Sequence, residues 1–75
     1  MEIMQGKHTR AIAAPELGRM LAGYREILID LGTGDGRFVL HAARQDPAIF
    51  AIGVDACREN LRAASRTAPA NALFA

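Results

Sequence analysis

The feature that most constrains this chain is an apolar run that ends in a glycine-rich bend. Residues 27–31 read Ile-Leu-Ile-Asp-Leu, which is apolar on both faces, as in strands buried inside a parallel sheet. The next five residues, Gly-Thr-Gly-Asp-Gly at 32–36, break the run sharply. Residues 37–45 then show a helical pattern, which Asp46-Pro47 ends. A strand, a tight bend and a helix in this order predict an α/β unit.

The same alternation repeats along the rest of the chain. A second buried strand is predicted over 50–55, a helix over 58–66, and the opening of a third strand at 73–75. Such alternation implies a parallel sheet with right-handed crossovers. We therefore interpret 26–75 as a partial Rossmann-like domain. Since doubly wound sheets have more strands than this, we expect the chain to be the N-terminal part of a larger protein.

Residues 1–25 are predicted to precede this domain as a short β-hairpin and a helix. The hairpin turn would fall at Gly6-Lys7. Pro15 and the acid after it suit the first turn of a helix, which would run to Ala22 and stop at Gly23.

Both later helices are predicted to be amphipathic. In the helix over 37–45, the arc expected to be buried holds Phe38, Val39, Leu40, Ala42 and Ala43, whereas His41 falls on the solvated side. In the helix over 58–66, the residues expected toward the core are Leu61, Ala63 and Ala64. The opposite side carries Arg58, Arg62 and Arg66, an arginine stripe that is usually solvated but could contact RNA. Cys57 is expected to pack this helix against the sheet.

Composition excludes several classes of protein. The 75 residues carry a formal net charge of +1 and a single cysteine, Cys57, so no internal disulfide can form, which fits a reducing cytoplasm. No apolar stretch approaches the roughly 20 residues that cross a bilayer. His8 and His41 stand alone, without metal-ligand spacing. We expect a cytoplasmic protein with no membrane segment and no metal.

Two carboxylates at strand ends define the candidate binding site. Asp30 closes the first strand before the bend, and Asp55 closes the second. In this topology both ends open onto one crevice. Asp55 is placed to accept hydrogen bonds from the two hydroxyls of a ribose, and Asp30 is placed to attract an ammonium group.

This charge pattern favours S-adenosylmethionine (SAM) over a dinucleotide. A pyrophosphate over the bend would meet Asp35, and like charges about 5 Å apart cost about 3 kcal/mol at an effective dielectric constant near 20. SAM carries a sulfonium and an ammonium but no phosphate. The plainer alternatives are that the glycines serve only a tight turn, that Asp55 is an ordinary strand-end acid, and that Asp35 mainly caps the following helix.

The stretches 29–37 and 52–61 resemble motif I and the second-strand region of the 16S rRNA adenine-N1 methyltransferases. Those enzymes confer kanamycin–apramycin resistance, and they too open with a hairpin that contains a Gly-Lys turn. The resemblance implies a class I, Rossmann-like methyltransferase that transfers a methyl group from SAM to adenine N1 in the decoding A-site of the small ribosomal subunit.

The resemblance also implies roles for particular residues. Asp30 and Gly32 would line the methionine side of the SAM pocket, with Thr33 and Gly34 close by. Asp55 would hold the ribose, and Ala56, where some members have Pro, would lie beside the adenosine. No catalytic residue is expected here, because adenine N1 has a lone pair and no proton to remove.

The family's later strands and loops, which supply adenine stacking and most ribosome contacts, have no counterpart in these residues. We therefore expect the chain alone to bind SAM weakly at best and not to methylate RNA. Other interpretations stay open: a different class I methyltransferase such as a tRNA guanine-N7 enzyme or a small-molecule enzyme, an inactive truncated remnant, or a dehydrogenase-type nucleotide binder.

Overall fold

The computed structural model describes residues 1–75 as five strands and three helices. In chain order the elements are β1 (Glu2–Gln5), β2 (His8–Ala11), α1 (Ala14–Leu21), β3 (Glu26–Leu31), α2 (Arg37–Gln45), β4 (Ile49–Val54), α3 (Arg58–Arg66) and β5 (Ala72–Phe74). Each predicted element is present, with ends that differ by one or two residues. None of the helices is long and apolar enough to cross a membrane.

The strands form one mixed sheet in the order β2-β1-β5-β4-β3. β3, β4 and β5 run parallel, as the alternating pattern predicted, with Ile29 opposite Ile52 and Gly53 opposite Phe74. The hairpin was predicted, but its place in the sheet was not. β1 pairs antiparallel with β5 through Met4 and Phe74, so the hairpin extends the sheet beyond β5.

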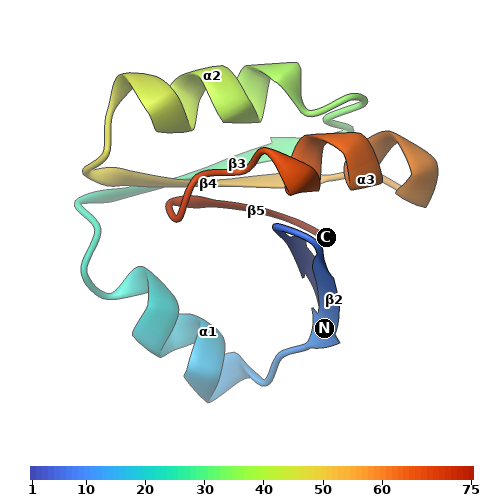
Figure 1. Ribbon diagram of the computed structural model, residues 1–75. Coiled ribbons are helices and arrows are strands. Elements are labelled where there is room, and N and C mark those ends of the chain that lie inside the picture. The colour runs from blue at the N-terminus through green and yellow to red at the C-terminus, as the bar shows by residue number, and fades with distance from the viewer.

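The helices cover the two faces of this sheet (Figure 1). α2 and α3 lie on one face, and α1 lies on the other. Two apolar cores follow from this arrangement. The core under α2 and α3 consists of Met4, Val39, Ala43, Ala51, Leu61, Ala64, Ala72 and Phe74. The core under α1 consists of Ile3, Ile12, Phe50, Ile52 and Leu73.

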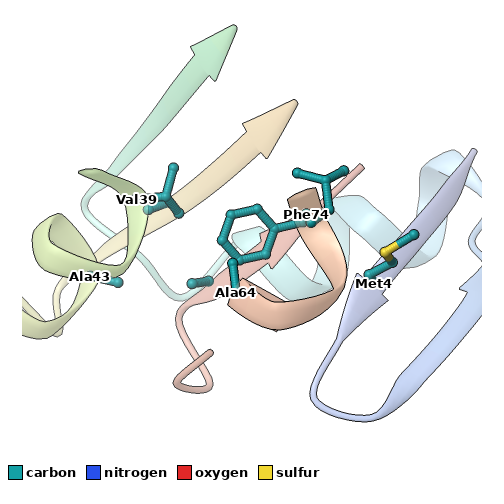
Figure 2. Close-up of a cluster of buried hydrophobic side chains, with 8 residues drawn as sticks. Met4, Val39, Ala43, Ala64 and Phe74 are labelled. Carbon is teal, nitrogen blue, oxygen red and sulfur yellow. The ribbon is translucent and has the colours of Figure 1, made fainter. Parts of the chain in front are cut away.

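Phe74 is the centre of the larger core (Figure 2). Its ring is fully buried and lies among Val39 and Ala43 of α2, Ala64 of α3 and Met4 of the hairpin. The ring therefore joins both helices to the sheet. Burial of an aromatic side chain of this size makes it one of the largest single contributions to the stability of the fold.

The expectation that the first strand lies buried inside the sheet is wrong for this chain. β3 has β4 as its one neighbour and forms an edge of the sheet. The side chains on the α1 side of β3 are 42%, 59% and 76% exposed at Ile27, Ile29 and Leu31. The reason is that α1 packs over β4 and β5 and leaves this face of β3 uncovered.

Some predictions of helix faces also need correction. Val39 and Ala43 of α2 are buried as expected, but Phe38 is 57% exposed. In α3, Ser65 is buried and Ala63 is exposed. Cys57 does not pack against the sheet, because it is the exposed residue immediately before α3. His41 and the three arginines of α3 are exposed, as predicted.

Candidate cofactor site at the glycine bend

The glycine bend between β3 and α2 is fixed to the end of β4. The backbone N–H groups of Gly32 and Thr33 both donate to the carbonyl oxygen of Val54, at 2.7 and 2.9 Å. The Gly36 N–H then donates back to the Thr33 carbonyl at 3.1 Å, which closes the turn before α2. The bend thus lies at the carboxyl ends of β3 and β4, where the sequence placed it.

Asp55 holds the bend from the other side. One carboxylate oxygen accepts the Gly34 N–H at 2.8 Å, and the other accepts the Cys57 N–H at 2.8 Å. The hydrogen bond from the Cys57 N–H lowers the pKa of Asp55 below its usual value, and the bond from the Gly34 N–H lowers it further. The structure therefore brings Asp55 together with the bend, although its oxygens contact backbone amides. Each oxygen has a further lone pair that can accept a hydroxyl.

Asp35 bonds the first residue of α2 from one position before the cap, so it is not the N-cap that the capping alternative predicted. Its carboxylate accepts the backbone N–H of Arg37 at 3.1 Å and pairs with the Arg37 guanidinium at 2.9 Å. These bonds lower the pKa of Asp35. Gly36 occupies the formal cap position and contributes no side chain. An N–H of the first helical turn, the kind of group that binds phosphates in nucleotide folds, is therefore already taken by a carboxylate.

The glycines of the bend have two different surroundings. A Cβ atom added at Gly32 or Gly34 would meet no heavy atom within 4 Å, so the outer side of the bend is open. A Cβ added at Gly36 would lie 2.6 Å from Cε1 of Phe74 and 2.7 Å from Cβ of Ala64. At Gly53 it would lie 2.6 Å from Cδ1 of Phe74. The third glycine of the motif is thus required by packing, and the first two leave space for a ligand.

Two polar side chains at the site have no protein partner. Thr33 is 9% exposed, and its hydroxyl is buried without a hydrogen bond. Asp30 lies opposite Gly53 near the end of β3 and is half-buried, and its carboxylate makes no hydrogen bond or ion pair. A buried hydroxyl and a free carboxylate beside an open bend are groups that a polar, positively charged ligand could satisfy.

A cavity of about 200 Å³ adjoins the bend at Asp55. Its walls come from the hairpin, the end of β5 and the start of α3, and the lining residues are Glu2, Met4, Asp55, Ala56, Arg58, Leu61 and Ala75. Asp55 and Ala56 are the two predicted site residues that line it; Asp30 and the bend residues lie outside. Met4 and Ala75 could not have been found from sequence, because only the long-range pairing of β1 with β5 brings them here.

No metal centre accompanies this site. No three of the His, Cys, Asp and Glu side chains gather where they could hold an ion.

A family model described as 16S rRNA (adenine(1408)-N(1))-methyltransferase (NpmA) matches residues 2–74. Relatives with curated names carry the same enzyme name. A 16S rRNA (adenine(1408)-N(1))-methyltransferase of Escherichia coli is 39% identical over 61 residues, which cover 81% of this chain and 28% of the relative. One of Streptoalloteichus tenebrarius is 29% identical over 70 residues, which cover 93% of this chain and 33% of the relative.

Solved structures share the fold. The antibiotic-resistance methyltransferase Kmr superposes with a TM-score of 0.88 at 39% identity over 99% of this chain and 42% of its own. The 30S ribosomal A1408 methyltransferase from an uncultured bacterium gives a TM-score of 0.90 at 31% identity, again over 99% of this chain and 38% of its own. The chain thus spans about a third of its curated relatives, 28% and 33% in the two cases above. The match across residues 2–74 shows that this chain belongs to the 16S rRNA (adenine(1408)-N(1))-methyltransferase family.

Proposed function

We propose that this chain forms the SAM-binding portion of an enzyme that methylates N1 of an adenine in the decoding A-site of 16S rRNA. The observation that carries the proposal is the open outer side of the bend, where a Cβ atom added at Gly32 or Gly34 would meet no heavy atom within 4 Å. A ligand can approach the backbone closely at such glycines. A ribosomal substrate would also make the protein cytoplasmic.

The charges around the bend support SAM as the ligand. The free carboxylate of Asp30 suits the ammonium of the methionine moiety, and the remaining lone pairs of Asp55 suit the ribose hydroxyls. The Thr33 hydroxyl, buried without a partner, is a further group that a bound ligand could satisfy. Ala56 and the cavity beside Asp55 would take the adenosine end. The chemistry of these side chains therefore fits SAM.

The same surroundings disfavour a dinucleotide. Its pyrophosphate would seek the first amides of α2, but Asp35 already accepts the N–H of Arg37 and would repel a second anion. The family assignment likewise favours adenine N1 over the alternative of a tRNA guanine-N7 enzyme.

Methyl transfer to adenine N1 requires little acid–base catalysis from the protein. SAM supplies an activated methyl group when bound. Adenine N1 offers a lone pair, so no side chain has to remove a proton. The role left to Asp30, Asp55 and the bend is to bind and orient the methyl donor, and positioning of this kind contributes several kcal/mol to lowering a barrier.

Two protein samples test the proposal. In the first, residues 1–75 are titrated with SAM by isothermal calorimetry, where we expect weak binding and no methyl transfer to 30S subunits. In the second, residues 1–75 replace the matching segment of the Escherichia coli relative. This hybrid should bind SAM and methylate adenine 1408 of the subunit, the position in the relative's name.

An Asp30→Ala variant of the hybrid serves as the control and should lose SAM binding while it stays folded. A folded hybrid that binds NAD but not SAM would overturn the proposal. Methyl transfer by residues 1–75 alone would instead contradict the expectation that the segment is incomplete as an enzyme.

A further inference from the structure

A second cavity, far from the glycine bend in sequence, lies between the hairpin turn and α3. Its volume is about 130 Å³, and no apolar residue lines it. The lining residues are Gly6, Lys7, His8, Thr9, Arg62, Ser65 and Arg66. We refer to these seven residues as the hairpin pocket. None of them belongs to the candidate SAM site.

The hairpin pocket is strongly cationic in a chain that is nearly neutral overall. Lys7, Arg62 and Arg66 line it together with one histidine, and no carboxylate does. Lys7 and Arg66 form no ion pair, so both charges are free. Arg62 pairs with Glu59 at 2.9 Å, but that pair is exposed, and exposed pairs are worth at most about 1 kcal/mol. An incoming anion could therefore recruit Arg62.

Local sequence explains why these groups converge. Gly6 has a φ of +63° at the first position of the two-residue turn, which places Lys7 at the tip of the hairpin and His8 opposite Gln5. Arg62 and Arg66 are four residues apart, so they lie on the same face of α3. Between them Ser65 is buried, and its hydroxyl donates to the Arg62 carbonyl oxygen at 2.9 Å within the helix.

The side chain of Gln5 fixes the hairpin just before its turn. The Gln5 amide donates to the carbonyl oxygen of Ala72 at 3.0 Å and to that of Ala70 at 3.4 Å. The hairpin turn is thereby linked to the segment that follows α3. The backbone next to Lys7 is thus fixed before any ligand arrives, which limits the backbone entropy lost on binding, while the cationic side chains themselves are exposed.

We propose that the hairpin pocket binds a phosphodiester group of an RNA backbone. This inference rests on the proposed function, which already requires RNA as substrate. Arginine matches the geometry of phosphate oxygens and lysine adds a point charge, and phosphate contacts position a protein on nucleic acid without reading its sequence. A wholly polar lining offers nothing to an apolar side chain of a protein partner.

The proposal also divides the arginine stripe of α3. Arg58 forms an ion pair with Glu2 and lines the cavity beside Asp55 instead. Only Arg62 and Arg66 face the hairpin pocket. The RNA contact considered for the whole stripe is therefore assigned to its second half together with Lys7.

The test compares charge reversals inside and outside the hairpin pocket. K7E and R66E are made in residues 1–75, and R19E on α1 is the matched control, because Arg19 is exposed and forms no ion pair. Binding of a fluorescent RNA hairpin with the decoding-site sequence is measured over a series of salt concentrations, and circular dichroism verifies folding. Inorganic phosphate is titrated separately, with amide chemical shifts of Gly6 and Thr9 as the readout.

We expect K7E and R66E each to weaken RNA binding about tenfold. The slope of log K against log salt concentration should become shallower by about one. R19E should stay within twofold of the unchanged chain. Equal losses in all three variants, or phosphate shifts at Gly6 without any effect of K7E on RNA, would overturn the proposal. SAM titration of the hybrid keeps the two ideas apart: a hybrid that does not bind SAM counts against the proposed function, whereas the RNA comparison of the variants tests the hairpin pocket alone.

Discussion

The two sides of the glycine bend contrast sharply. On the packed side, Gly36 and Gly53 lie against the ring of Phe74, so closely that a methyl group would clash with it. On the open side, Gly32 and Gly34 face empty space, and the neighbouring face of β3 is exposed. All three glycines of the bend have left-handed backbone, but packing leaves no room for a side chain at Gly36, whereas the space beside Gly32 and Gly34 is open to a ligand. Substitutions should separate the two.

The largest effect is expected from Gly36→Ala on the packed side. The new methyl group would lie 2.6 Å from the Phe74 ring, and overpacking of a core costs about 1–3 kcal/mol. The left-handed backbone, with a φ of +76°, adds about 1 kcal/mol for any residue with a Cβ. The free energy of unfolding should fall by about 3 kcal/mol in urea denaturation.

Two further variants make this measurement specific. Gly18→Ala, in helix α1 with nothing near its added Cβ, should leave stability unchanged or raise it by about 0.5–1 kcal/mol. Phe74→Leu should cost less in the Gly36→Ala background than in the unchanged chain, because the smaller side chain relieves part of the clash. If Gly36→Ala unfolds like the unchanged chain, Phe74 does not explain this glycine.

A substitution on the open side should reduce SAM binding more than it reduces stability. Gly34→Ala introduces a methyl group that meets no protein atom, so the free energy of unfolding should fall only by the backbone cost of about 1 kcal/mol. In the hybrid with the Escherichia coli relative, SAM affinity measured by isothermal calorimetry should fall by tenfold or more, because the methyl group occupies the space through which the ligand approaches. Gly23→Ala, also without neighbours, is the control. Unchanged SAM affinity in a folded Gly34→Ala variant would count against the ligand site.

A smaller effect on stability is expected from protonation of Asp55, whose carboxylate bonds the bend. The pKa of Asp55 is lowered in the folded chain by the N–H groups of Cys57 and Gly34. Its stabilising contribution is therefore complete above the ordinary aspartate pKa of about 3.9. It is lost as the pH falls below that value through the lower folded pKa.

Hydrogen exchange at the Gly34 amide, followed from pH 6 to pH 3, measures this directly. After correction for the intrinsic pH dependence, protection should fall below pH 4 in the unchanged chain. In Asp55→Asn it should be low and flat. Asp35 also has a lowered pKa, so Asp35→Asn serves as the control and should keep the pH dependence at Gly34.

Sequence alone predicted most of this arrangement and missed what depends on distant partners. The strand–bend–helix order and the place of Asp55 at the end of a buried strand follow from local patterns. The packing of Gly36 on Phe74 does not, because the two residues are 38 positions apart in the chain and the sequence motif does not distinguish one glycine from another. The pairing of the hairpin with β5 was missed for the same reason.

The exposed face of β3 was missed because burial depends on neighbours. The run at 27–31 is as apolar as that of β4, but β3 has a strand on one side only. An apolar side chain at an open edge makes few of the contacts that the same side chain makes in the centre of a sheet. Register gives a direct comparison, since Ile29 lies opposite Ile52 on the adjacent strand.

The smallest effect is therefore expected at Ile29. Ile52 is 7% exposed and packs in the core under α1, whereas Ile29 is 59% exposed. Ile52→Val should lower the free energy of unfolding by about 0.5–1.5 kcal/mol, as for other buried isoleucines. Ile29→Val should change it by less than about 0.5 kcal/mol, since the lost methyl group already contacts solvent. Equal losses at the two positions would mean that β3 is covered in solution, and the open side would then have to be redefined.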